Sequence, residues 1–273
     1  MADNLRLRGF QLNNLHSNSA AAPLQNNGNI NIILLGKTGV GKSSSGNTIL
    51  GEERFKCKKS LKSVTTFVKA ENSVVEGRHV SVVDTPGFFD TKLSVEELAE
   101  QLALSVFLST PGPHAFLFVL QADRFTEQEE EVLDEIKMIF GQGVLKYLIL
   151  LFTNGENIDL ETFDSEVNDH VKLRNIVASC QGYHIFNNKE QTNRQQVNDL
   201  LQKIDSMIEQ NGGGHYSNRM FEEARRFKKE QEERNEDQDS FCAFGYFWKL
   251  FAYLFINIAC KICGKRNNQY RRL

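Results

Sequence analysis

The stretch Gly36-Lys37-Thr38-Gly39-Val40-Gly41-Lys42-Ser43 decides the fold of this chain. It has the spacing G-x-x-x-x-G-K-S, and the apolar run of residues 30–35 comes directly before it. Such a run is typical of a buried parallel strand, and residues 43–50 can begin a helix after the loop. A strand, a glycine-rich loop and a helix in this order predict a phosphate-binding loop rather than a glycine-rich turn without a ligand.

The residue types in this loop indicate phosphate and magnesium chemistry. The glycines allow successive backbone N–H groups to curl around a phosphate, and the helix N-terminus adds positive potential. We expect Lys42 to neutralise β- and γ-phosphate oxygens and the Ser43 hydroxyl to ligate Mg²⁺. The predicted phosphate-side residues are Gly36, Lys37, Thr38, Gly39, Val40, Gly41, Lys42, Ser43 and Ser44.

Composition sets broad limits on the function. The chain has 273 residues, enough for an α/β core, and a net charge of −3, so we expect no nucleic-acid partner. The five cysteines are an odd number, and no signal peptide precedes the first strand, so a reducing cytosolic setting is expected. Cys260-x-x-Cys263 lacks a second Cys or His pair, which argues against a zinc site.

Two segments after the loop predict a nucleotide switch. A basic run at residues 54–62 leads to Thr65 and Thr66, either of which could complete the Mg²⁺ shell. A predicted hairpin (residues 67–75 and 78–84) ends in Asp84-Thr85-Pro86-Gly87. There Asp84 can hold Mg²⁺ through water, and the Gly87 N–H can bind the γ-phosphate. Phe88 stands where Ras-like enzymes place a water-orienting glutamine, so hydrolysis should be slow or assisted.

The next segment alternates predicted helices and strands. Ser94-x-x-Glu97 and Thr126-x-x-Glu129 are capping boxes, and residues 114–121 and 147–152 are apolar enough for strands. His114 begins a strand without an evident partner base, so we interpret it as structural. Arg124 is either an exposed surface residue or a finger that reaches another subunit's phosphates.

Together, these motifs resemble the GIMAP family of immunity-associated, AIG-type GTPases, which are related to septin and Toc GTPases. The resemblance rests on Gly36–Ser43, on residues 84–91, and above all on the box from Pro111-Gly112-Pro113-His114 to Arg124-Phe125-Thr126. It implies a Ras-like P-loop G domain that binds GTP or GDP with Mg²⁺ and dimerises or polymerises through its nucleotide face. It also implies a role in immune-cell survival or defence, at an organelle membrane. By motif position, Thr65 matches the switch threonine, and Arg124 the arginine proposed to act across the dimer.

The base-reading motif departs from this pattern. G proteins use Asn-Lys-x-Asp and the family often uses Thr-Arg-Lys-Asp, whereas this chain has Thr153-Asn154-Gly155-Glu156. Guanine presents two donors to a carboxylate, and glutamate is one methylene longer than aspartate, so Glu156 can still accept both. We predict base contacts from Asn154, Glu156 and Asn187, with Asp159 as a second candidate carboxylate.

The C-terminal segment changes character. Residues 241–263 are apolar all round a helix and are followed by basic residues. Lys249 in the middle disfavours a clean span, so we expect an interfacial membrane anchor rather than a helix folded back onto the domain. The predicted divisions are a mobile arm (1–27), a G domain (28–230), a charged linker (231–240), the anchor (241–263) and a basic tail (264–273).

The sequence therefore predicts a GTP-binding switch with a mainly parallel sheet flanked by helices and a C-terminal helical extension. We expect a slow GTPase that self-associates and is cytoplasmic, attached to an organelle membrane. Two alternatives remain: a GTP-bound scaffold that does not hydrolyse, suggested by Phe88, and an ATP-using phosphotransferase. The second is disfavoured because no lid with clustered arginines is visible.

Overall fold

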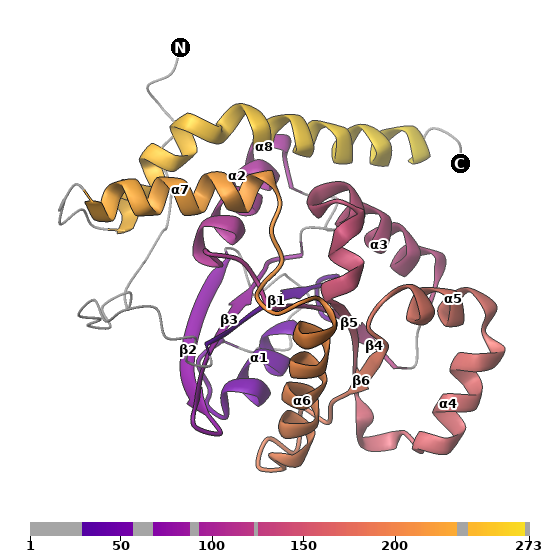
Figure 1. The fold of residues 1–273 in the computed structure, drawn as a ribbon. Helices are drawn as coiled ribbons and strands as arrows, with labels where there is room; N and C mark the ends of the chain where they lie inside the picture. The colour runs from indigo at the N-terminus through magenta and orange to yellow at the C-terminus, as the bar shows by residue number, and fades with distance from the viewer. Residues whose placement is uncertain (1–28, 57–67, 88–92, 123–124, 234–239, 271–273) are drawn as a thin grey trace.

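In the computed structural model, residues 29–56, 68–87, 93–122, 125–233 and 240–270 are described. They form a six-stranded sheet in the order β2-β3-β1-β4-β5-β6 (Figure 1). Only the β2–β3 pair is antiparallel in this sheet. The predicted mainly parallel sheet is therefore confirmed. The strands are β1 (Ile30–Leu35), β2 (Lys69–Val75), β3 (Arg78–Asp84), β4 (Ala115–Gln121), β5 (Leu148–Thr153) and β6 (Tyr183–Ile185).

Helices cover both faces of the sheet, as alternate residues of the buried strands require. In β1, Ile32 and Leu34 face α1 and α6, whereas Ile33 and Leu35 face the core that includes α2, α3, α7 and α8 (Figure 1). The helices are α1 (Lys42–Leu50), α2 (Val95–Leu108), α3 (Glu127–Phe140), α4 (Leu160–Asp169), α5 (Val171–Ser179), α6 (Gln195–Gln210), α7 (Arg219–Glu233) and α8 (Ser240–Tyr270). Two 3-10 turns span Gln142–Tyr147 and Gly155–Asn157.

Local signals in the sequence set several element boundaries. The capping boxes at Ser94 and Thr126 both form, and they begin α2 and α3 as predicted. The predicted hairpin also forms, with Glu76 and Gly77 at positive φ in its turn. His114 is structural, because its Nδ1 accepts the Asn31 N–H at 3.0 Å. Burial, with nearby His215 and Arg78, lowers the pKa of His114 to about 4, so the ring is a neutral acceptor.

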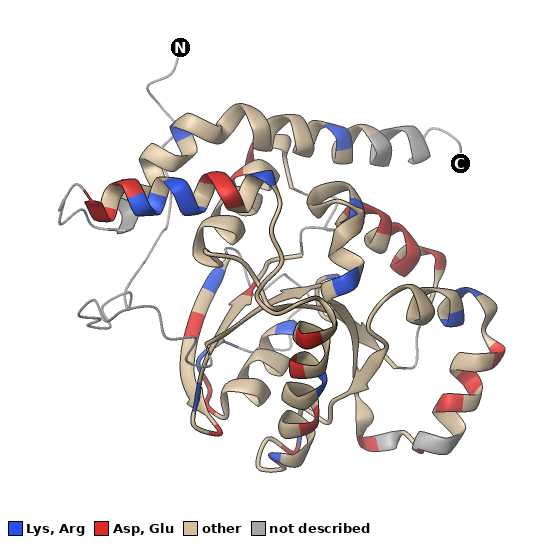
Figure 2. Ribbon diagram, in the orientation of Figure 1, with Lys and Arg blue, Asp and Glu red and all other residues tan. Residues whose placement is uncertain are grey.

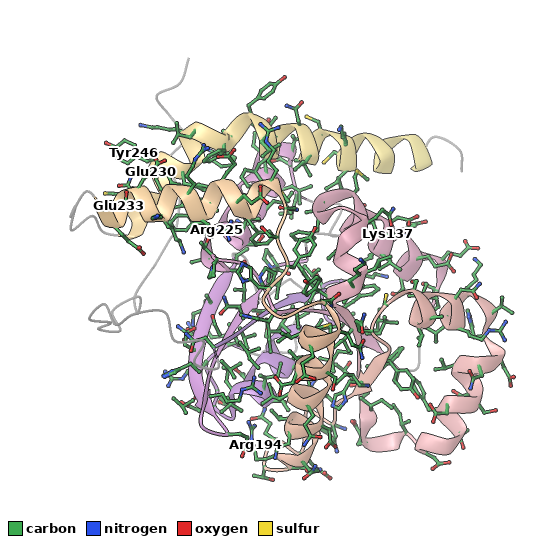
Figure 3. All side chains as sticks on the ribbon, viewed as in Figure 1. Lys137, Arg194, Arg225, Glu230, Glu233 and Tyr246 are labelled. Atoms are coloured by element: carbon green, nitrogen blue, oxygen red, sulfur yellow. The ribbon has the colours of Figure 1, made fainter. Side chains whose placement is uncertain are left out.

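The C-terminal helix α8 lies across α2, which is the folded-back arrangement that the sequence analysis disfavoured (Figure 1). The Phe107 ring of α2 lies 5.7 Å from the Phe244 ring and 5.3 Å from the Phe247 ring. The opposite face of the helix is open, since Leu250 is 66% and Tyr253 81% exposed. Tyr246, labelled in Figure 3, belongs to this open face. Within α8, the stretch Cys242–Gly264 is also long and apolar enough to cross a membrane.

Candidate nucleotide site

The predicted phosphate loop lies at the carboxyl end of β1, between the neighbouring strands β3 and β4. Ligands of open α/β sheets bind outside this edge. Gly41 is the N-cap of α1 at φ 100°, a conformation that favours glycine, and it turns the loop into the helix. The loop therefore presents the N-terminus of α1 to an incoming phosphate.

Lys42 is folded onto its own loop. Its Nζ donates to Gly36 O at 2.9 Å and to Lys37 O at 2.7 Å, and the residue is 7% exposed. Burial lowers the pKa of Lys42 to about 8, although the Asp84 charge opposes this shift. A phosphate would offer a stronger acceptor than the two carbonyl oxygens, and its charge would raise the pKa of Lys42.

Ser43 and Asp84 meet at the place predicted for a cation. The Ser43 hydroxyl donates to Asp84 Oδ2 at 2.5 Å, and Asp84 is buried at the end of β3. Next to it, Thr85 Oγ1 donates to Leu34 O at 2.6 Å, which fixes the end of β3 against β1. A hydroxyl and a carboxylate are hard oxygen donors that suit Mg²⁺, with phosphates and water completing its shell. The predicted third ligand, Thr65, lies outside the described residues.

Gly87 packs directly against the phosphate loop. A Cβ atom at this position would lie 2.2 Å from Thr38 Oγ1 and 3.1 Å from the Thr38 backbone nitrogen. Any side chain would therefore push the segment after β3 away from the loop. This contact places the Gly87 backbone directly beside the phosphate loop.

Lys37 connects the loop to the start of α3. Its Nζ contacts Gln128 Oε1 at 2.6 Å and Glu129 Oε1 at 3.2 Å. Burial raises the pKa of Glu129, but hydrogen bonds from Thr126 and from Lys37 outweigh it and bring the pKa below its usual value. The charged carboxylate thus both caps α3 and holds the loop. Arg124, the proposed finger, precedes this cap but lies outside the described residues.

The base side brings Glu156 and the loop after β6 together. Glu156 pairs with Lys189, with Oε1 and Nζ 2.5 Å apart, and its side chain is 20% exposed. Asn154 is exposed in the left-handed conformation at φ 64°. The Asn187 side-chain oxygen accepts the Lys189 N–H at 3.0 Å, so its amide nitrogen is the group that can donate to a guanine O6. Asp159 instead caps α4, because its Oδ2 accepts hydrogen bonds from the Thr162 N–H and hydroxyl. This capping role argues against Asp159 as the second candidate carboxylate for the base.

Three further residues tie the end of β5 and the segment after β6 to the phosphate loop or to α1. Thr153 Oγ1 donates to Val40 O at 2.8 Å, which ties the end of β5 to the phosphate loop. The Asn188 amide contacts Ser45 Oγ and Thr48 Oγ1, both in α1. Arg194, labelled in Figure 3, donates to the carbonyl oxygens of Thr48 and Ile49 at the end of α1. None of these roles belongs to a sequence motif; the one signal in the sequence is an amide after a strand, at Asn188.

The sheet order, the loop after β1 and the Ser43–Asp84 pair define the P-loop G-domain class of nucleotide-binding fold. The model of the AIG1 family matches residues 30–236, and the chain belongs to this family. This match covers all the strands and the helices α1 to α7.

Curated relatives agree with this assignment. The chain is similar to immune-associated nucleotide-binding protein 10 of Arabidopsis thaliana, with 33% identity over 77% of this chain and 47% of that protein. It is 36% identical to immune-associated nucleotide-binding protein 8 of the same plant, over 74% of this chain and 62% of that protein. GTPase IMAP family member 8 of Homo sapiens is 32% identical over 69% of this chain and 29% of its own length. The chain thus spans about half of these plant relatives and less of the human one.

Solved structures confirm the fold. Toc33 from Arabidopsis thaliana, in a dimerization-deficient mutant, aligns with a TM-score of 0.53 and 19% identity, over 66% of this chain and 84% of Toc33. Toc33 in complex with GDP and Mg²⁺ aligns with a TM-score of 0.52 and 18% identity, over 66% of this chain and 84% of Toc33. At this identity, the likeness establishes the shared fold.

Proposed function

We propose that this protein is a GTP-dependent switch that uses Mg²⁺ and hydrolyses GTP slowly. The observation that carries the proposal is the convergence of Lys42, the Ser43–Asp84 pair and Gly87 on one phosphate loop. Lys42 would leave the loop carbonyls for the β- and γ-phosphates, and the Gly87 N–H would bind the γ-phosphate. Mg²⁺, when bound, would neutralise developing charge on the phosphates, held by Ser43, Asp84 and Thr65.

Guanine is the proposed base. Glu156 would accept the guanine N1–H and N2–H₂ donors, while the Asn187 amide nitrogen would donate to O6, beside Asn154. The names of the relatives, with immune-associated and GTPase descriptions, support a guanine-nucleotide function and an immune role.

Self-association is the second part of the proposal. Dimerization is important for the GTPase activity of the chloroplast translocon components atToc33 and psToc159, and a solved structure from that system shares this fold with a TM-score of 0.53. We propose that GTP orders the segments around Thr65 and Gly87 and so creates a surface for a second copy. Arg124 would then stabilise the partner's transition state in trans.

Turnover at different protein concentrations tests this arrangement. We expect phosphate release per site to rise with wild-type concentration, and Arg124→Ala to remove that rise while leaving GTP affinity within about twofold. Arg54→Ala is the matched control, because Arg54 pairs with Glu52 on the surface. Turnover that is independent of concentration in both proteins would exclude the finger. A complete lack of multiple-turnover phosphate release would support the alternative scaffold suggested by Phe88.

Membrane attachment through the open face of α8 is the third part. The segment 240–273 contains no Asp or Glu and carries six basic residues, and Figure 2 marks only basic charge on the described part of α8. We propose that Tyr246, Leu250 and Tyr253 enter an anionic lipid surface while Phe244 and Phe247 stay on α2. Helix and domain would then lie together on the cytoplasmic face of an organelle membrane.

Vesicle sedimentation tests this attachment. Leu250→Ser with Tyr253→Ser should reduce binding to phosphatidylserine vesicles several-fold without lowering the melting temperature, because both residues face outward. Val74→Ser with Val171→Ser removes exposed apolar side chains elsewhere and should change nothing. Wild-type protein that resists alkaline extraction from the vesicles would show a spanning helix instead.

A further inference from the structure

The ion pair between Glu156 and Lys189 links two loops on the base side. Its Nζ–Oε1 distance is 2.5 Å, and the carboxylate is 20% exposed while the lysine is 73% exposed. The two residues are far apart in sequence, one after β5 and the other after β6. The pair thus joins the proposed base reader to a different loop.

The loop that carries Lys189 is held in one conformation by hydrogen bonds. The Lys189 N–H donates to Asn187 Oδ1 at 3.0 Å, and the Glu190 N–H donates to Asn187 O at 3.2 Å. The Gln196 side chain of α6 accepts the Asn187 N–H at 2.9 Å and donates to the carbonyl oxygens of Asn187 and Glu190. This turn presents Lys189 from a fixed backbone, although the tip of its side chain is exposed.

Gly155 brings the two loops close enough for the pair. Its N–H donates to Phe186 O at 3.0 Å, and a Cβ atom at this position would lie 2.7 Å from Ile185 Cγ2 and 3.0 Å from Phe186 O. A side chain at residue 155 would therefore separate the Glu156 turn from the end of β6. The close approach at Gly155 thus places the turn that carries Glu156 beside the end of β6, where the loop of Lys189 begins.

We propose that Lys189 is a specificity-determining positioning residue of the base site, which holds the Glu156 carboxylate in the orientation that reads guanine. This inference rests on the proposed guanine function. A carboxylate offers two lone pairs on each oxygen, so Oε1 can accept from Lys189 and from one guanine donor while Oε2 accepts the other. With Lys189 in place, both oxygens of the Glu156 carboxylate are oriented toward the guanine donors before the nucleotide binds.

The test compares nucleotides that differ in these donors. Inosine triphosphate lacks the exocyclic amine and can make only one of the two hydrogen bonds. For the full chain with Mg²⁺, we expect Lys189→Ala to weaken GTP binding about fivefold and inosine triphosphate binding about twofold, which lowers the ratio between them. Lys189→Arg should restore that ratio. Lys172→Ala, which removes a comparable surface pair with Glu130, is the matched control and should leave all affinities unchanged.

A second comparison separates positioning from a general structural effect. In a Glu156→Ala background, the further change Lys189→Ala should have no effect on GTP affinity, because Lys189 acts through that carboxylate. Equal losses for GTP and inosine triphosphate, or an effect that persists without Glu156, would overturn the inference. If wild-type protein bound ATP as tightly as GTP, the proposed function itself would fail. If the wild-type protein bound GTP tightly and Lys189→Ala left the ratio of GTP affinity to inosine triphosphate affinity unchanged, only the role of Lys189 would be rejected.

Discussion

The two ends of the candidate nucleotide site are built differently. At the phosphate end, Lys42 and Asp84 are buried and their partners come from the loop and the adjoining strand. At the base end, Asn154 is exposed, and Glu156 is held by Lys189 from another loop. The first end rests on backbone geometry within a short contiguous motif, whereas the second depends on side chains from separate loops.

This difference parallels the sequence, in which the phosphate end follows the family pattern and the base end departs from it. A phosphate is recognised by N–H groups and charge, which a short loop fixes regardless of the rest of the chain. A base is recognised by side chains, and in this chain Glu156 follows Gly155 and pairs with Lys189 from another segment. The base end should therefore tolerate substitution better than the phosphate end.

The largest effect is expected at Lys42. Lys42→Ala removes the charge aimed at the β- and γ-phosphates, and we expect GTP and ATP affinity to fall together by about a hundredfold or more. Nucleotide titration by calorimetry measures this, and the melting temperature of the variant without nucleotide controls for folding. A loss for GTP alone would contradict the assignment, because the phosphate end cannot distinguish bases.

Glu156 is expected to give a smaller and base-selective effect. Glu156→Ala removes two hydrogen bonds to a charged acceptor, so GTP affinity should fall about 20-fold while weak ATP binding stays unchanged. Glu156→Gln should instead favour xanthosine triphosphate, since the glutamine amide can donate to the C2 oxygen. Competition against a fluorescent GTP analogue checks both variants. An unchanged preference for GTP in Glu156→Ala would show that another residue reads the base.

The pH dependence of binding should also come from the phosphate end. Burial holds the pKa of Lys42 near 8, so the lysine is charged at pH 7 and mostly neutral at pH 9. A bound phosphate raises the pKa of Lys42, so nucleotide binding above pH 8 takes up a proton. Nucleotide affinity should therefore fall about tenfold between pH 7 and pH 9. Calorimetry in two buffers of different ionisation enthalpy detects the uptake. Constant affinity over this range would mean that Lys42 stays charged throughout.

Thr153, where the two ends meet, should give the smallest effect. Thr153→Val keeps the shape but leaves the Val40 and Leu120 carbonyl oxygens without this donor, which should cost about 1 kcal/mol of stability and about threefold in GTP affinity. Thr110→Val, which removes similar hydrogen bonds at the end of α2, should lower the melting temperature without changing affinity. If Thr153→Val and Thr110→Val both bound GTP as tightly as the wild type, the two ends of the site would be independent.

The sequence predicted the fold and the position of the loop between β1 and α1 because both depend on local signals. The apolar β1, the spacing of the loop glycines and the two capping boxes each act over a few neighbouring residues. The helices α4 and α5 carried no motif and were not predicted. The Lys189–Glu156 pair could not be foreseen either, since it joins two loops that are far apart in sequence.

The packing of α8 on α2 was not predicted, for a related reason. Its sequence is apolar all round, so nothing in it distinguishes a face for lipid from a face for protein. The structure makes that distinction, because Phe244 and Phe247 pack on α2 while Leu250 and Tyr253 stay open. The predicted divisions of the chain at residues 27, 230, 240 and 263 stay predictions, although α8 runs as one helix through the last of them.

The most direct test of a guanine-nucleotide switch is Mg²⁺-dependent binding of GTP, GDP and ATP to the purified full chain, with the particle mass determined in each state. We predict that GTP binds at least about a hundredfold more tightly than ATP and shifts the protein from monomer to dimer, while GDP leaves it monomeric. Preferential binding of ATP, or one mass in all three states, would contradict the account.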